Sequence, residues 1–180
     1  EYASKLNKGE GVDINKREAS KYYKKAADLG HIESMFEYAF MRDKGEGISI
    51  NKEEAAKYYK MGADCGNSNA MFGYGVLLYN GEGVDLDKRK ASKYFKKAAD
   101  AGNVDSMEYY AVMNDNGDGI AVDKKEAAKY YKMAADEGNT KAMCNLGVLL
   151  YKGDGIVTYK KKAAKYFKKA ADAGNTEAMF

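Results

Sequence analysis

Gly81-Glu82-Gly83-Val84 is one copy of a glycine, acid, glycine, aliphatic tetrad that returns every 36 residues along the 180-residue chain. The other copies begin at Gly9, Gly45, Gly117 and Gly153. A fixed period of this length is typical of a solenoid, in which each repeat contacts mainly its neighbours. The chain is therefore expected to form a single domain over residues 1–180, built from five repeats.

Each repeat is predicted to contain two helices. The helix after the tetrad, which we name helix B, has an apolar face in its first copy, formed by the residues at helical spacing Ala19, Tyr22, Tyr23, Ala26 and Ala27. Asn15 followed by Glu18 predicts its N-cap, and Gly30 predicts its end. Helix A follows that glycine and runs to the next tetrad, so the tetrad is the turn from helix A to helix B.

Helix A is expected to begin at an asparagine cap, with His31 as the substituted cap of the first full copy. Its buried side is expected to carry a methionine, then Tyr or Leu, then Ala or Gly, and its methionines are Met35, Met71, Met107 and Met143. The predicted fold class is all-α: a right-handed α-α superhelix of about five 36-residue helix-turn-helix repeats.

Charge and composition exclude several classes of function. Lys and Arg number 30 against 27 Asp and Glu, and a net charge of +3 spread over five repeats is no footprint for nucleic acid. No apolar run approaches the roughly 20 residues that span a bilayer, so no membrane insertion of this segment is expected. Cys65 and Cys144 fall at different positions of the repeat, which favours small buried side chains over a disulfide framework and favours a reducing, cytoplasmic compartment.

The repeat resembles the Sel1-like repeat, a relative of the tetratricopeptide repeat. In one copy the resemblance is carried by Ala70, Tyr74-Gly75, Gly81-Glu82-Gly83-Val84, Lys90-Ala91, Tyr94-Phe95, Ala98-Ala99 and Gly102. The chain departs from the family in lacking proline after the turn and in having tyrosine where tryptophan is common, at Tyr22, Tyr58, Tyr94, Tyr130 and Tyr166. These changes concern core packing. The resemblance implies an α-solenoid and an adaptor role, as in membrane-associated quality control and signalling.

No catalytic, metal or cofactor site is predicted, and the chain is not expected to be an enzyme. The segment 114–119 resembles the start of an EF-hand calcium loop, but Lys125 stands where that loop needs a bidentate acid. His31 is the single histidine, which leaves no residue set for a histidine-dependent triad or zinc site. A ladder of lysines on the outer side of helix B reads either as a solvated face, the favoured alternative, or as an anion-binding surface.

A protein or peptide partner is expected on the concave side of the solenoid, which the resemblance implies is formed by helix A facing inwards. Residues there vary between repeats beside an apolar strip, which indicates an interaction surface. The predicted partner-binding residues are Glu37, Phe40, Val76, Asp105, Tyr109, Val112, Asn145 and Val148. The alternative for the strip is that neighbouring repeats cover it as core.

A second hypothesis for function is a structural spacer that assembles by end-to-end self-association. Met179-Phe180 is expected to begin another helix A, and Glu1-Tyr2-Ala3 to resume one, so neither end has a polar capping repeat. The segment is therefore expected to come from a longer array.

Overall fold

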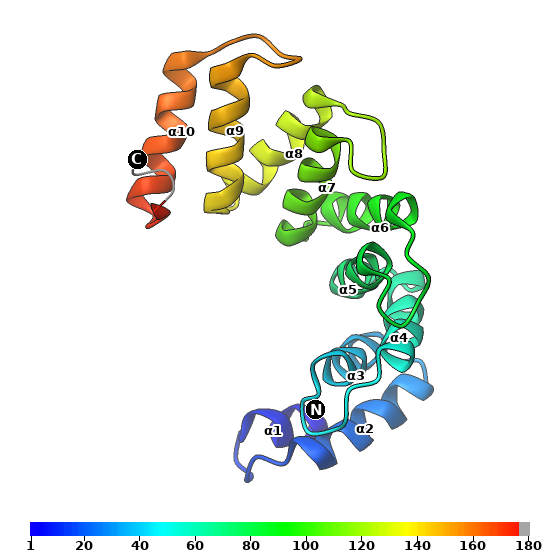
Figure 1. Cartoon of the computed structure of the whole chain (residues 1–180). Helices are drawn as coiled ribbons and strands as arrows, with labels where there is room; N and C mark the ends of the chain where they lie inside the picture. Colours follow the sequence, from blue (N-terminus) through cyan, green and yellow to red (C-terminus); the bar gives the residue numbers. More distant parts are fainter. Residues whose placement is uncertain (177–180) are drawn as a thin grey trace. The chain divides into compact units, whose positions relative to one another are not determined.

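A computed structural model describes residues 1–176, and within that range it contains helices and turns but no strands (Figure 1). The helices are α1 (Tyr2–Lys8), α2 (Lys16–Asp28), α3 (Ile32–Lys44), α4 (Lys52–Asp64), α5 (Ser68–Asn80), α6 (Lys88–Asp100), α7 (Val104–Asn116), α8 (Lys124–Asp136), α9 (Thr140–Lys152) and α10 (Lys160–Asp172). Odd-numbered helices are helix A and even-numbered ones helix B. The predicted all-α fold of 36-residue helix pairs is confirmed.

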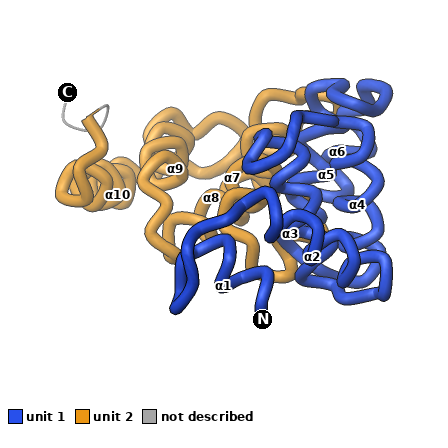
Figure 2. Tube along the Cα trace, turned by 90° about the horizontal axis from the view of Figure 1, so that it is seen from below, with its two compact units in different colours: residues 1–94 blue, residues 95–180 orange. Residues whose placement is uncertain are grey.

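The chain divides into two compact units, unit 1 over residues 1–94 and unit 2 over residues 95–180 (Figure 2). The predicted start of a further helix A at Met179-Phe180 lies outside the described residues.

The predicted caps form as expected. The Asn15 side chain accepts a hydrogen bond from the Glu18 N–H at 3.0 Å, and Asn51 and Asp123 cap α4 and α8 in the same way. His31 accepts from the Ser34 N–H at 3.2 Å and so caps α3, as predicted. Among the described B helices with an assigned cap, α10 is the exception, because Tyr159 makes no side-chain cap bond.

The tetrad ends helix A and also packs on the preceding repeat. Gly45 has a φ of 74°, which favours glycine, and its N–H donates to the Met41 carbonyl at 2.9 Å. The second glycine of the next copy, Gly83, lies so close to the start of α4 that a Cβ there would stand 2.2 Å from the Lys52 carbonyl carbon. Glu82, between the glycines, forms an ion pair with the Lys52 side chain at 2.7 Å. The tetrad is thus a turn and a contact between repeats at once.

The same lysine of helix B also contacts the end of the helix A before it, and this contact alternates. At the second and fourth tetrads the partner is an aspartate, in the pairs Lys52–Asp43 at 2.6 Å and Lys124–Asp115 at 2.8 Å. At the third and fifth tetrads it is a tyrosine ring, with the lysine nitrogen 4.8 Å from the ring centre in Lys88–Tyr79 and 5.6 Å in Lys160–Tyr151. Aspartate and tyrosine therefore alternate at this helix A position from the second tetrad to the fifth, and either partner is attracted to the ammonium group.

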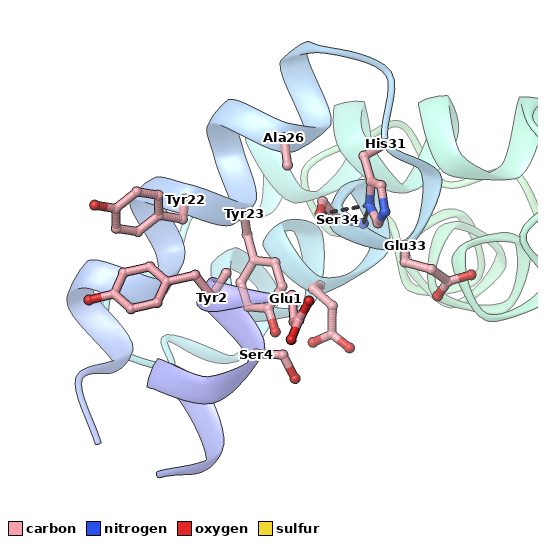
Figure 3. Close-up of a pocket in the computed structure, with 11 residues that line it drawn as sticks. Glu1, Tyr2, Ser4, Tyr22, Tyr23, Ala26, His31, Glu33 and Ser34 are labelled. Carbon is pink, nitrogen blue, oxygen red and sulfur yellow. Dashed lines mark hydrogen bonds between the residues drawn. The ribbon is translucent and has the colours of Figure 1, made fainter. Parts of the chain in front are cut away.

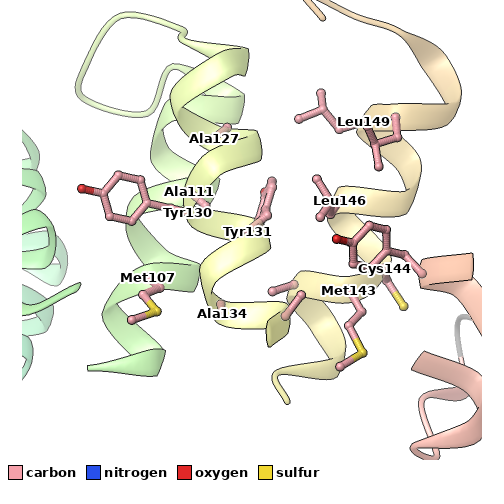
Figure 4. Close-up of a cluster of buried hydrophobic side chains, with 14 of the residues drawn as sticks. Met107, Ala111, Ala127, Tyr130, Tyr131, Ala134, Met143, Cys144, Leu146 and Leu149 are labelled. Carbon is pink, nitrogen blue, oxygen red and sulfur yellow. The ribbon is translucent and has the colours of Figure 1, made fainter. Parts of the chain in front are cut away.

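The core of unit 2 lies between α7, α8, α9 and α10 (Figure 4). The apolar face of α8 is buried as predicted, and Tyr131 points from it toward Leu146 of α9. Leu149 is also buried, at a helix A position that the sequence analysis left off the buried side. Its counterparts Met41, Leu77 and Met113 are each 1% exposed.

Tyrosine hydroxyls connect neighbouring B helices. In unit 1, Tyr58 Oη donates to Asp28 at 2.5 Å and accepts from Lys24 at 2.9 Å. In unit 2, Tyr130 donates to Asp100 and accepts from Lys96. A tyrosine at this position therefore contributes a polar contact between repeats in addition to its buried ring.

The prediction that both cysteines are buried is wrong for one of them. Cys144 is buried within α9, but Cys65 is exposed. Cys65 follows the last residue of α4, at the junction of helix B with the next helix A. The equivalent residue Leu29 is 89% exposed, so this junction points to solvent whatever residue it carries.

Candidate protein-binding face

All eight predicted partner-binding residues lie on A helices. Unit 1 holds Glu37 and Phe40 of α3 and Val76 of α5, and unit 2 holds the other five on α7 and α9. We refer to this side of the A helices in each unit as the helix A face.

In unit 1 the helix A face is only partly covered. Phe40 and Val76 are both half-buried on helices that contact each other. The Phe40 ring lies 6.1 Å from the Phe36 ring, between ring centres. Gly73 is the counterpart of Glu37 in the next repeat, and a Cβ there would stand 2.7 Å from the Tyr59 ring, so packing restricts this position to glycine although its counterparts vary.

In unit 2 the helix A face exposes more apolar surface. Tyr109 is 39% exposed and Val148 is 40% exposed, while Val112 is half-buried. The Tyr109 ring packs against Phe95 with 5.1 Å between ring centres. Asp105 is exposed and Asn145 is half-buried, so polar groups accompany the apolar ones.

Electrostatics at this face are set by partly buried acids. Burial raises the pKa of Glu37, Lys8 opposes this shift, and Glu33 and Glu46 add to it. In unit 2, Glu108 accepts a hydrogen bond from the Asn139 side chain at 3.0 Å. Sequence reasoning missed Glu108, although its place one residue before Tyr109 could have indicated it.

A pocket missed by the sequence analysis adjoins this face in unit 1. It has a volume of about 390 Å³ and is lined by residues of α1, α2 and α3, including Tyr2, Tyr22, Tyr23, Glu33 and Glu37 (Figure 3). Tyr22 was expected to be buried with the other helix B tyrosines, but it is 40% exposed. The sequence feature that could have indicated the pocket is the pair of acids Glu33 and Glu37, which lie one helical turn apart on α3.

In the segment 114–119, which resembles the start of a calcium loop, Asp115 makes other contacts. Asp115 accepts from the Lys124 side chain at 2.8 Å and from Tyr131 at 3.2 Å. Across residues 1–176, no group of three or more His, Cys, Asp or Glu side chains is placed to hold a metal ion. In the same range, no helix is both long and apolar enough to cross a membrane.

The lysine ladder of helix B is paired along each helix. A lysine and the aspartate four residues later form an ion pair in every copy, in Lys24–Asp28, Lys60–Asp64, Lys96–Asp100, Lys132–Asp136 and Lys168–Asp172. Such exposed pairs contribute little to stability, because water and salt screen their charges. They agree with a solvated outer face.

Comparison with known proteins gives concordant results. The family model described as Sel1 repeat matches residues 3–31, 32–67, 68–103, 104–139 and 140–175. No curated protein matches the chain.

Solved structures share the fold. A Sel1 repeat protein from Oxalobacter formigenes is 30% identical, with a TM-score of 0.90 over 99% of this chain and 73% of its own. The cysteine-rich protein B of Helicobacter pylori is 25% identical, with a TM-score of 0.56 over 73% of this chain and 96% of its own. The antigen c5321 of uropathogenic Escherichia coli is 24% identical, with a TM-score of 0.61 over 99% of this chain and 46% of its own, and shows the fold alone. With five matched repeats spanning nearly its whole length, the chain belongs to the Sel1 repeat family.

Proposed function

We propose that this chain is a scaffold whose helix A face binds a peptide or a folded protein. Sel1 repeat proteins are generally protein-interaction scaffolds, and their solenoid fold is typically non-catalytic. The proposal goes beyond this family role by naming the helix A face as the binding surface. Binding by the A helices would leave the tetrad turns and the lysine ladder free for contacts between and within repeats.

The observation that carries the proposal is the exposure of Tyr109 and Val148, at 39% and 40%, on the A helices of unit 2. Tyrosine is enriched at interfaces because it buries a large rigid ring while keeping a polar hydroxyl. Each Å² of apolar surface removed from water contributes about 25 cal/mol. The apolar residues would therefore supply affinity, and Asp105 and Asn145 would fix the register of the partner.

The experiment places a photo-crosslinking amino acid at position 109 and, in a matched chain, at position 122. Val122 is 55% exposed in the turn between α7 and α8, and it is not one of the residues of the helix A face. A partner crosslinked from position 109 and not from position 122 supports the face. Equal crosslinking from both positions would contradict it.

A second arm tests affinity with that partner in purified form. The double variant Tyr109→Ser with Val148→Ser should weaken binding at least tenfold, because it removes two large apolar contacts. The control is Val122→Ser with Val157→Ser, which removes aliphatic side chains that are 55% and 65% exposed and lie off the helix A face. An equal loss in both variants would show that general surface hydrophobicity drives binding.

A further inference from the structure

A second pocket in unit 1 lies beside the third tetrad, where α4, α5 and α6 meet. It has a volume of about 720 Å³, and the buried residues Tyr74 and Leu78 of α5 line it. Four exposed charged residues also line it, and these are Glu53, Asp85, Asp87 and Lys90. Complete repeats come before and after this one in the chain, so the walls of the pocket do not depend on where the sequence begins or ends.

In the preceding repeat, an arginine side chain fills the equivalent place. Arg42 and Tyr38 of α3 are the counterparts of Leu78 and Tyr74, 36 residues earlier. The Arg42 guanidinium carbon lies 5.6 Å from the centre of the Tyr38 ring, and Arg42 Nε donates to the Tyr38 hydroxyl at 3.0 Å. Arg42 Nη1 donates to the Ser49 carbonyl at 3.1 Å. The space between a helix A tyrosine and the following turn therefore accommodates a guanidinium group.

The third repeat keeps the surroundings of this group but has no arginine to fill them. Leu78 is shorter than arginine and uncharged, while the tyrosine ring is retained as Tyr74. Asp85 is the counterpart of Ser49, so the turn offers a carboxylate in addition to its carbonyl. The Lys90 ammonium group lies 5.8 Å from the centre of the Tyr74 ring, which indicates that the ring still attracts a cation.

The charges around the pocket favour a cationic ligand. Its three carboxylates outnumber the single ammonium group of Lys90. Glu53 is particular to this pocket, because the four other copies carry a base at its position, namely Arg17, Arg89, Lys125 and Lys161. Within the part of the chain that the structure describes, no group of three or more acids is placed to hold a metal ion. The carboxylates are thus spread around the pocket, as an extended organic cation requires.

We propose that this pocket binds the guanidinium group of an arginine side chain on a second protein. The group would take the place that Arg42 has in the preceding repeat, stacked on Tyr74 and paired with the carboxylates, because a guanidinium can stack and form paired hydrogen bonds at once. Leu86 is 60% exposed between Asp85 and Asp87, so an apolar residue beside the arginine would contact it. Lys90 would compete with the ligand for the ring.

This site goes beyond the proposed function, because it is a second binding surface. Among the described residues that line the pocket are none of the eight predicted for the helix A face. A partner could therefore contact the pocket and the helix A face independently, and each surface can be tested without the other.

The test uses the full chain and a short labelled peptide that carries one arginine between two leucines and no other charge. A matched peptide carries citrulline, which keeps the shape of arginine without its charge. Fluorescence anisotropy should show at least tenfold weaker binding for the citrulline peptide, and equal affinity would overturn the proposal. A lysine peptide that binds as tightly would overturn the guanidinium assignment. If N-acetyl-arginine amide binds as tightly as the peptide, the ligand is a small molecule and the second protein is the wrong source.

Two variants close the pocket. Leu78→Arg should weaken binding of the arginine peptide at least tenfold, because the new side chain would fill the pocket as Arg42 fills its own. Glu53→Arg restores the base of the other copies and should also weaken binding at least tenfold, because like charges repel. Circular dichroism checks that both variants are folded. If Leu78→Arg unfolds, Glu53→Arg decides the test, since Glu53 is exposed. Unchanged affinity in Glu53→Arg would overturn the proposal.

Two further variants separate this pocket from general surface charge. Asp85→Asn should weaken binding about two- to fivefold, while Asp13→Asn, at the same motif position of the first repeat and equally exposed, should leave it unchanged. Lys90→Gln removes the competing cation and should strengthen binding about two- to fivefold. Equal losses in Asp85→Asn and Asp13→Asn, or weaker binding in Lys90→Gln, would overturn the assignment. Crosslinking at position 109 has no bearing on these results, so the two proposals can fail separately.

Discussion

Replacing the second glycine of a tetrad with alanine tests whether this residue is fixed by its backbone angle or by its contact with the neighbouring repeat. Gly11 and Gly83 occupy the same motif position, with φ values of 76° and 68°. No atom lies within 4 Å of a Cβ built on Gly11, whereas at Gly83 the nearest atoms are the Lys52 carbonyl carbon at 2.2 Å and its oxygen at 2.4 Å. The two sites therefore differ mainly in the contact.

The expected losses follow from these numbers. A left-handed conformation costs an alanine about 1–2 kcal/mol, so Gly11→Ala should lower the free energy of unfolding by about that amount. Gly83→Ala bears the same cost and must also move the turn away from α4, because both clashing atoms are backbone. Forcing atoms into a packed contact costs about 1–3 kcal/mol more, and the half-buried Lys52–Glu82 ion pair adds little to this.

The assay is urea unfolding followed by circular dichroism, with hydrogen exchange to locate the loss. Because stability in a repeat array is transmitted between neighbours, Gly83→Ala should increase amide exchange in α4 and α5 first. Equal losses of stability in Gly11→Ala and Gly83→Ala would refute the reasoning, since the backbone angle alone would then explain the motif.

Three further changes have expected outcomes. Ser106→Ala should stabilise the chain by about 0.5–1.5 kcal/mol in urea unfolding, because the Ser106 hydroxyl is buried without a hydrogen-bond partner; a loss of stability would reveal a partner. Tyr130→Phe should cost about 1–2 kcal/mol in the same assay, because it removes the bonds to Asp100 and Lys96; no change would mean that water replaces them. The pKa of Glu37 is raised on folding, so wild-type stability should fall as pH rises above about 4.3, and Glu37→Gln should lack this part of the fall. Parallel pH profiles would contradict the assignment.

The regular features of the repeat could be predicted from the sequence because they depend on local chemistry. Asn15 and Gly30 mark the ends of a helix wherever they occur at this spacing, and the structure has α2 between them. The buried face of helix B followed from the 3.6-residue period in the same way. The helical wheel for helix A was less complete, since it omitted Met41, which is 1% exposed. That residue lies in the contact with other helices, which a single-helix wheel does not include.

Contacts between repeats were the part that could not be predicted. The acid of each tetrad was recognised as a turn residue, yet Glu46 pairs with Lys16, 30 residues earlier in the chain, at 2.5 Å. Only the packing of one helix pair on the next brings them together. The pocket beside α3 was missed for the same reason, because its tyrosines and glutamates come from three helices.

The packing of the tetrad on the start of the preceding helix B affects how the repeats of such a chain can be rearranged. At Gly47 and Gly83 the turn contacts main-chain atoms of the lysine that begins the preceding helix B, and at Gly155 it contacts the side chain of that lysine. A lysine stands at the start of every helix B, as Lys16, Lys52, Lys88, Lys124 and Lys160. This joint between the tetrad and helix B therefore uses residues that the repeats share, and not the residues that distinguish one repeat from another. Repeats of this chain should be exchangeable as modules, so that shuffling their order would compose new binding surfaces without redesigning the joints.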